Sequence, residues 1–184
     1  MEAQNEKYYT YNDYKTWGNE TRYELIDGVP YMMSSPSHIH QRVLRELFKQ
    51  LAVFLTGKSC ELFSAPSDVR LNPYEYDDIV VQPDLFVVCD KSKLDGQSCI
   101  GAPDLIIEIL SPSTEGHDRF VKLGLYQKAG VREYWIVDPD EKGILAHTLK
   151  DDSYIVKPYH GDVKIPVSVL DGCERTLTDI FAES

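Results

Sequence analysis

The chain has 184 residues, of which 42% are hydrophobic and 27% are charged, a composition typical of one globular domain with its own hydrophobic core. No apolar run approaches the roughly 18 residues of a membrane-spanning helix, and the polar N-terminus does not look like a secretory signal, so we expect a cytoplasmic protein with no membrane partner. The net charge of −11 argues against loose binding to nucleic acid, although divalent cations or a local basic groove would offset the repulsion.

The first third of the chain predicts a β-hairpin followed by a long helix. Two short apolar runs over residues 23–33 flank an Asp-Gly pair, which is a preferred two-residue turn between strands. After a loop over residues 34–38, apolar side chains recur at three- and four-residue steps over residues 40–55, which predicts an amphipathic helix. The opposite face of this helix carries a basic stripe, which could meet phosphates but which we favour as a solvated polar face. The stripe consists of Arg42, Arg45 and Lys49.

Three segments in the middle of the chain favour strands. Residues 60–71 predict a short strand with an irregular end. Residues 79–88 predict a strand that Pro83 interrupts, which indicates a sheet edge or a bulge at that point. Residues 104–110 are almost continuously apolar, as expected of a strand that is buried on both faces.

A strand–helix–strand unit continues from the third of these strands. A helix is predicted over residues 118–129 and ends at Gly130, and residues 132–137 form the next strand. The strands before and after the helix should therefore be parallel, joined by a right-handed crossover. Residues 144–149 and 154–158 then predict an antiparallel extension of the sheet.

These elements predict the fold class α/β (α+β), a mixed β-sheet core flanked by helices. We expect a single domain over residues 1–184 with its core over about 20–160. The four cysteines show neither a CxxC pair nor a metal-type spacing to histidines, so reduced and mostly buried thiols are expected. They are Cys60, Cys89, Cys99 and Cys173.

Two carboxylates stand alone in the apolar strands. Glu108 is the only charge in residues 105–110, and Asp84 is the only charge in residues 79–88. Either could face outward from a half-exposed strand, but a buried carboxylate without a partner is unfavourable by several kcal/mol. Because neighbouring strands lie about 4.8 Å apart, the two acids can converge on one point, where a divalent cation would remove their repulsion. Oxygen ligands favour Mg²⁺ or Mn²⁺.

Lys122 lies in the helix that follows the Glu108 strand, on the same face as Tyr126 because the two are four residues apart. Beside a metal site, this lysine could orient a water molecule and stabilise charge that builds on a phosphate in the transition state. The alternative is a solvated helix lysine, which would be the preferred interpretation without the two acids.

Four motifs, in order, resemble one family of proteins. They are YELIDG (23–28), VQPD (81–84), PDLIIEILSPS (103–113) and GVREYWIVDP (130–139). The pair Gln82-Pro83-Asp84 and Glu108-Ile109-Leu110 resembles the bipartite signature of the PD-(D/E)XK nuclease superfamily. The whole set, over roughly 23–139, is similar to the Uma-type family of bacterial restriction-endonuclease-like proteins.

The resemblance implies a restriction-endonuclease-like mixed sheet with a metal held by Asp84, Glu108 and the backbone carbonyl of Ile109. It also implies Mg²⁺ or Mn²⁺ as cofactor and DNA as substrate. The sequence departs from the signature at Leu110, where a lysine is expected, and Lys122 is the candidate that replaces it. Glu24 matches an upstream catalytic acid of such nucleases, or is an exposed strand residue beside the hairpin turn. His40 matches a family position to which we assign no role.

Three functions are compatible with these residues. The first is a metal-dependent endonuclease that hydrolyses phosphodiester bonds of DNA, with Asp84, Glu108, Lys122 and Glu24 as catalytic residues. The second is a catalytically inactive descendant, a binding or regulatory protein that self-associates, which the acidic charge and the missing lysine at position 110 favour. A homodimer is plausible in both cases. The third is purely structural, with the acids paired to Lys122 in a buried network.

Overall fold

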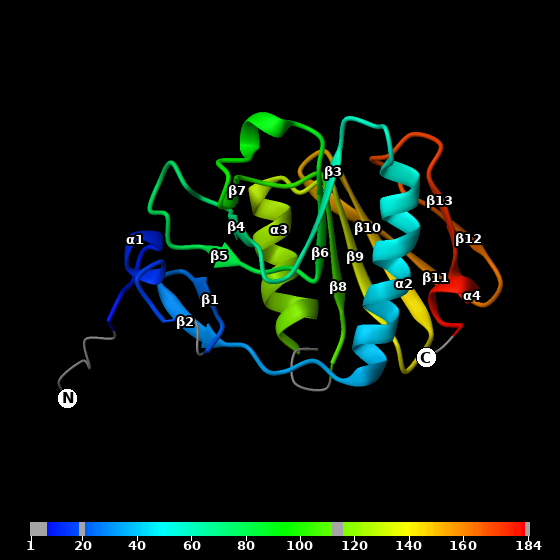
Figure 1. Ribbon diagram of the computed structural model, residues 1–184, viewed down its shortest axis with the longest axis horizontal. Helices are drawn as coiled ribbons and strands as arrows, with labels where there is room; N and C mark the ends of the chain where they lie inside the picture. Colours follow the sequence, from blue (N-terminus) through cyan, green and yellow to red (C-terminus); the bar gives the residue numbers. More distant parts are fainter. Residues whose placement is uncertain (1–6, 19–20, 112–115, 183–184) are drawn as a thin grey trace.

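The computed structural model describes residues 7–18, 21–111 and 116–182, and a mixed six-stranded sheet forms its centre (Figure 1). The strand order is β11-β10-β9-β8-β6-β3, in which β8 and β9 are parallel and the other neighbours are antiparallel. The α+β class and the mixed sheet predicted from the sequence are therefore confirmed. The strands are β3 (Glu61–Ser64), β6 (Leu85–Val88), β8 (Leu105–Ile109), β9 (Glu133–Asp138), β10 (Gly143–Lys150) and β11 (Ser153–His160).

The predicted strand–helix–strand unit is present between β8 and β9. The connection is helical throughout its last part, first as a π-helix, η2 (His117–Lys122), and then as α3 (Leu123–Ala129). Gly130 ends α3 in the left-handed region, with φ of 86°, which a glycine adopts without a steric penalty. Residues 112–115, which include part of the third family motif, lie outside the described residues.

A second, five-stranded sheet has the order β2-β1-β5-β4-β7 and lies beside the first. Residues 79–88 were predicted as one strand, and this prediction is wrong: β5 belongs to the second sheet and β6 to the first. The chain changes sheet at Gln82-Pro83-Asp84, the point that the proline marks. Residues 60–71 divide in the same way, between β3 and β4. The strands are β1 (Tyr23–Ile26), β2 (Val29–Met32), β4 (Asp68–Arg70), β5 (Val80–Val81) and β7 (Ser98–Ile100).

Helix α2 (His38–Leu55) covers one face of the central sheet (Figure 1). It begins two residues earlier than predicted, because the side chain of Ser37 accepts a hydrogen bond from the backbone N–H of His40 and caps the first turn. Its buried face is apolar except for His40 and Glu46, and its basic stripe is exposed, as expected of a solvated face. The apolar face comprises Val43, Leu47, Leu51 and Leu55.

The alternation of side chains along β8 builds a core on each face of the sheet. Leu105, Ile107 and Ile109 pack with α2, whereas Ile106 packs with Tyr126 of α3 and with the second sheet. All five residues of β8 are buried, which confirms the prediction from its continuous apolar run. Glu108 has the same parity as Ile106, so its side chain points to the α3 side of the sheet.

The C-terminal segment adds to the core on the α2 face. Its apolar side chains join the α2 cluster as far as Phe181, beyond the core boundary predicted at about residue 160. In the part of the chain that the structure describes, no helix is long and apolar enough to cross a membrane. The remaining elements are α1 (Tyr11–Tyr14), the short 3-10 helix η1 (Lys91–Lys93), β12 (Lys164–Pro166), β13 (Glu174–Thr176) and α4 (Leu177–Ile180).

The cysteines differ from the expectation of reduced thiols. Cys60 and Cys89 form a disulfide, because β3 and β6 pair with Glu61 opposite Val88 and so bring the residues just outside the pair together. Cys99 and Cys173 are free and buried, as predicted. Spacing along the chain could not show the disulfide, since 29 residues separate the two cysteines.

Candidate active site

Asp84 and Glu108 meet where β6 and β8 pair. Leu85 lies opposite Ile107, so Asp84 and Glu108 are next to each other across the two strands. The backbone N–H of Asp84 donates to Oε2 of Glu108 at 3.2 Å, and the N–H of Ile109 donates to Oδ2 of Asp84 at 2.8 Å. Each carboxylate is thus held by the main chain of the other strand. The predicted convergence of the two acids is present in the structure.

Lys122 and Tyr126 reach Glu108 from the helical segment that follows β8. Nζ of Lys122 and the hydroxyl of Tyr126 donate to the same oxygen, Oε1 of Glu108, at 2.9 and 2.8 Å. Lys122 is only 4% exposed, which excludes the alternative of a solvated helix lysine. Burial, and after it the negative charge of Glu108, raises the pKa of Tyr126 well above its ordinary value. The phenol therefore acts as a hydrogen-bond donor to the carboxylate.

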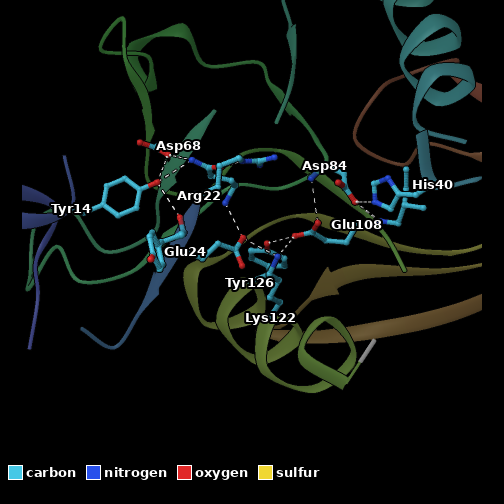
Figure 2. A network of polar contacts seen from close by, with 12 residues as sticks. Tyr14, Arg22, Glu24, His40, Asp68, Asp84, Glu108, Lys122 and Tyr126 are labelled. Carbon is cyan, nitrogen blue, oxygen red and sulfur yellow. Dashed lines mark hydrogen bonds and ion pairs between the residues drawn. The ribbon is translucent and has the colours of Figure 1, made fainter. Parts of the chain in front are cut away.

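Glu24 completes this cluster from strand β1 of the second sheet. Its Oε1 lies 2.9 Å from Nζ of Lys122 and accepts a hydrogen bond of 2.9 Å from the backbone N–H of Gln82. Glu24 is 4% exposed, so it is not the exposed strand residue of the alternative interpretation. One lysine is held between two buried carboxylates that come from two different sheets (Figure 2).

His40 was not assigned a role from the sequence, and the structure places it against Asp84. Its Nε2 lies 3.0 Å from Oδ2 of Asp84, whereas its Nδ1 is buried and has no hydrogen-bond partner in the described part of the chain. The short chain distance from the cap residue Ser37 fixes His40 in the first turn of α2. In the sequence, its position at the predicted start of the helix and its match to a family position distinguished it.

A second polar group extends the cluster toward the N-terminus (Figure 2). The side-chain amide nitrogen of Gln82 donates to Tyr14 Oη and to Asp68 Oδ1, each at 2.9 Å, and the amide oxygen accepts from Nε of Arg22 at 3.0 Å. Tyr14 itself donates to Asp68 at 3.0 Å. Apart from Gln82, which lies in a family motif, these residues carried no signal in the sequence, because each stands in a polar or mixed segment.

The carboxylates of the cluster, together with His40 and Lys122, line one cavity of about 330 Å³. Asp84 is the most accessible of the three acids, with 19% of its side chain exposed, whereas Glu24 and Glu108 are largely shielded by Lys122 and Tyr126. Among the residues that line the cavity are Arg22, Glu24, His40, Gln82, Asp84, Glu108, Ile109 and Lys122.

Comparison with known proteins gives the family. Residues 7–178 match the family Uma2, whose description is "Putative restriction endonuclease". The chain belongs to the Uma2 family. The resemblance found from the four sequence motifs is confirmed.

Two relatives of this Uma2 protein come from Synechocystis. "Uncharacterized protein slr1290" is 28% identical over 158 residues, which are 83% of this chain and 81% of that protein. "Uncharacterized protein sll1609" is 30% identical over 118 residues, which are 62% of this chain and 65% of that protein. The crystal structure of "a putative nuclease belonging to DUF820" from Anabaena variabilis has a TM-score of 0.76 at 20% identity, and the match covers 92% of this chain and 95% of that one. This likeness shows a nuclease-like fold.

The side chains of the Uma2 site can be compared with the ligands that Mg²⁺ and Zn²⁺ prefer. Among the described residues, no group of three or more His, Cys, Asp or Glu side chains has the arrangement of a metal site. Three carboxylates line the cavity, Glu24, Asp84 and Glu108, and Ile109, whose main-chain carbonyl is the further ligand expected from the sequence, lines it too. A small set of hard oxygen ligands fits Mg²⁺, which usually binds through one or two carboxylates and keeps several waters. The same set does not fit a structural zinc site.

Proposed function

We propose that this Uma2 protein is a metal-dependent endonuclease that hydrolyses phosphodiester bonds of DNA. The observation that carries the proposal is the convergence of Asp84, Glu108 and Lys122 on one cavity, in a family and a fold that are nuclease-like. A fold alone does not imply a function, so the proposal rests on the chemistry of these side chains.

Asp84 and Glu108, with the carbonyl of Ile109, would hold Mg²⁺ or Mn²⁺. When bound, such a cation polarises a phosphoryl oxygen and lowers the pKa of a water ligand. The chain prepares these oxygens through its backbone, since the N–H groups of Asp84 and Ile109 fix the two carboxylates. Two carboxylates this close repel each other, and their repulsion favours a cation at the site.

Lys122 would supply the positive charge that the signature places at position 110. Its ammonium group lies against Glu108 and Glu24 in a buried setting, where an electrostatic interaction is stronger than in water. From this position it would orient the attacking water and stabilise the charge that develops on the phosphate. Glu24 would hold Lys122 in place from the second sheet, and Tyr126 would hold Glu108.

The test is cleavage of plasmid DNA by the purified wild type with Mg²⁺ or Mn²⁺, compared with the variants Asp84→Asn, Glu108→Gln and Lys122→Met. Each substitution should abolish cleavage in a protein that still unfolds cooperatively. The matched control is Asp104→Asn, which changes the other Pro-Asp pair of the chain, because Asp104 pairs with Arg132 outside the cavity. Full cleavage by Asp84→Asn or Glu108→Gln would overturn the proposal.

A second candidate is a nuclease-fold protein without activity that binds or regulates by self-association, as a homodimer. The observation in its favour is that Leu110 stands at the lysine position, while both carboxylates next to Lys122 already neutralise its charge. Sedimentation measurements would test the dimer. Binding of Mn²⁺ to the wild type that disappears in Asp84→Asn, together with cleavage, would count against this candidate.

A further inference from the structure

Arg22 lies in the wall of the cavity, and none of the acids that the structure describes forms an ion pair with it. Its Nε donates to the neutral amide oxygen of Gln82, and Nη2 is buried with no hydrogen-bond partner among the described residues. Nη1 makes no hydrogen bond with a described residue either. In the described part of the chain, no carboxylate forms an ion pair with Arg22.

An arginine in a cavity wall with an unpartnered N–H group is suited to bind an anion. A guanidinium group is a cation with five N–H donors, of which Gln82 accepts from one. A buried charge or N–H group without a partner is unfavourable, and two carboxylates of the same polar network, Glu24 and Asp68, form no ion pair with Arg22. Those carboxylates are engaged elsewhere: Glu24 with Lys122 and Asp68 with Tyr14 and Gln82.

The amide of Gln82 fixes the direction of the guanidinium. Its nitrogen donates to Tyr14 and Asp68, so its oxygen must face Arg22. The same residue donates its backbone N–H to Glu24 and lies two positions before Asp84 in the chain. Arg22 is therefore a positive group held in the wall of the same cavity as the candidate metal ligands Asp84 and Glu108.

We propose that Arg22 binds a phosphate of the DNA backbone adjacent to the phosphate that is cleaved. The planar fork of an arginine matches two oxygens of a phosphate, and the bond is charge-assisted. This contact would position the strand in a cavity whose other charged groups are mostly acids, and would supply a cation that does not depend on bound metal. The inference rests on the proposed endonuclease function and adds a residue that binds the substrate.

The experiment measures binding of a fluorescein-labelled DNA duplex by anisotropy over a series of salt concentrations, in Ca²⁺, for the wild type, Arg22→Gln and Arg22→Lys. The loss of one charge-assisted hydrogen bond should weaken binding by Arg22→Gln about tenfold. The slope of log affinity against log salt concentration should fall by about 0.9, the value for one phosphate contact. Arg22→Lys should keep the slope and recover part of the affinity, which also controls for a folding defect. Lys150→Gln, which removes one exposed positive charge on β10, should change neither quantity.

Cleavage assays with Mg²⁺ separate this inference from the proposed function. Arg22→Gln should raise KM and leave kcat nearly unchanged, because a contact to a phosphate that does not react binds substrate and transition state equally. Active Arg22→Gln with wild-type affinity and salt slope would overturn the role of Arg22 alone. Absence of DNA binding and cleavage in the wild type would overturn both proposals. Stabilisation of the wild type by inorganic phosphate, lost in Arg22→Gln without a change in DNA affinity, would assign the site to a free phosphate and overturn the DNA contact.

Discussion

At the scale of single residues, Lys122 forms ion pairs with one carboxylate from each of the two sheets, Glu24 and Glu108. It lies 2.9 Å from a carboxylate oxygen on each side, and all three groups are buried. Removal of one member of a buried ion pair leaves an uncompensated charge, which is more harmful than replacement of the whole pair by neutral groups. Lys122 therefore stabilises the fold in addition to its proposed role in catalysis.

This arrangement predicts the stability of Lys122→Met. The variant leaves Glu24 and Glu108 close together without the ammonium group, so its free energy of unfolding should fall by about 3–5 kcal/mol. The double variant Lys122→Met/Glu24→Gln should regain part of that loss, because an amide can donate to Glu108. Urea unfolding at pH 7.5 measures both values. Lys128→Met is the matched control on the exposed side of α3, and a Lys122→Met variant as stable as this control would contradict the prediction.

The sequence identified those site residues that contrast with their neighbours. Asp84 and Glu108 are single charges in apolar runs, so their burial with a charged partner could be inferred from the energy of an unpaired carboxylate. Arg22 and His40 stand in polar segments, where a charged or polar side chain is expected at the surface. Their place at the cavity follows from the position of the hairpin and of the first turn of α2, which no local pattern contains.

At the scale of elements, the sequence correctly predicted the helices and strands that pack against the same neighbours along their whole length. Helix α2 and strands β8 to β11 each pack against one set of neighbours, so their periodicity is uninterrupted. The segments 60–71 and 79–88 change from one sheet to the other, and an apolar run has the same pattern whether it stays in one sheet or crosses between two. Pro83 indicated an interruption, but the second sheet is formed by residues far apart in the chain.

Strand β10 carries a buried histidine that should make stability depend on pH. His147 lies between the rings of Tyr134 and Tyr154, with ring centroids at 5.6 and 5.7 Å. Burial disfavours the charged imidazolium and lowers the pKa of His147 below its ordinary value of 6.5. The unfolded chain then binds the proton more readily than the native protein. Stability from this group is complete above the unfolded pKa and is lost as the pH falls below it.

The corresponding prediction compares the wild type with His147→Phe, which keeps a ring in the stack and cannot be protonated. Between pH 7.5 and 5.5, the wild type should lose more of its free energy of unfolding than the variant, by at most about 1.4 kcal/mol per pH unit. Urea unfolding at several pH values gives this difference. His38→Gln, at an exposed site, should keep the wild-type dependence. A constant difference between wild type and His147→Phe would show that the imidazole does not titrate on unfolding.

At the scale of the whole molecule, both the net charge of −11 and the acidic residues of the site should make the stability of the folded chain depend on added salt. Self-repulsion destabilises a compact chain with a high net charge, and any salt reduces this effect by screening. The cation proposed to bind Asp84 and Glu108 would add a second effect, because it would bind the native state and not the unfolded chain. The two effects can be separated, since the first depends only on ionic strength and the second requires both carboxylates.

Charge screening and specific cation binding can be distinguished by thermal unfolding. The melting temperature is measured in Mg²⁺ or Mn²⁺ and in NaCl of the same ionic strength. The wild type should unfold at a higher temperature in the divalent cation than in NaCl, and a cation present at about ten times its Kd adds roughly 1.4 kcal/mol. Asp84→Asn should respond to both salts equally, because it retains the screening and lacks a ligand. Equal responses in the wild type would show that the cation only screens charge. The nuclease-like fold would then remain without its metal site, and the inactive, self-associating protein would become the better description of the function.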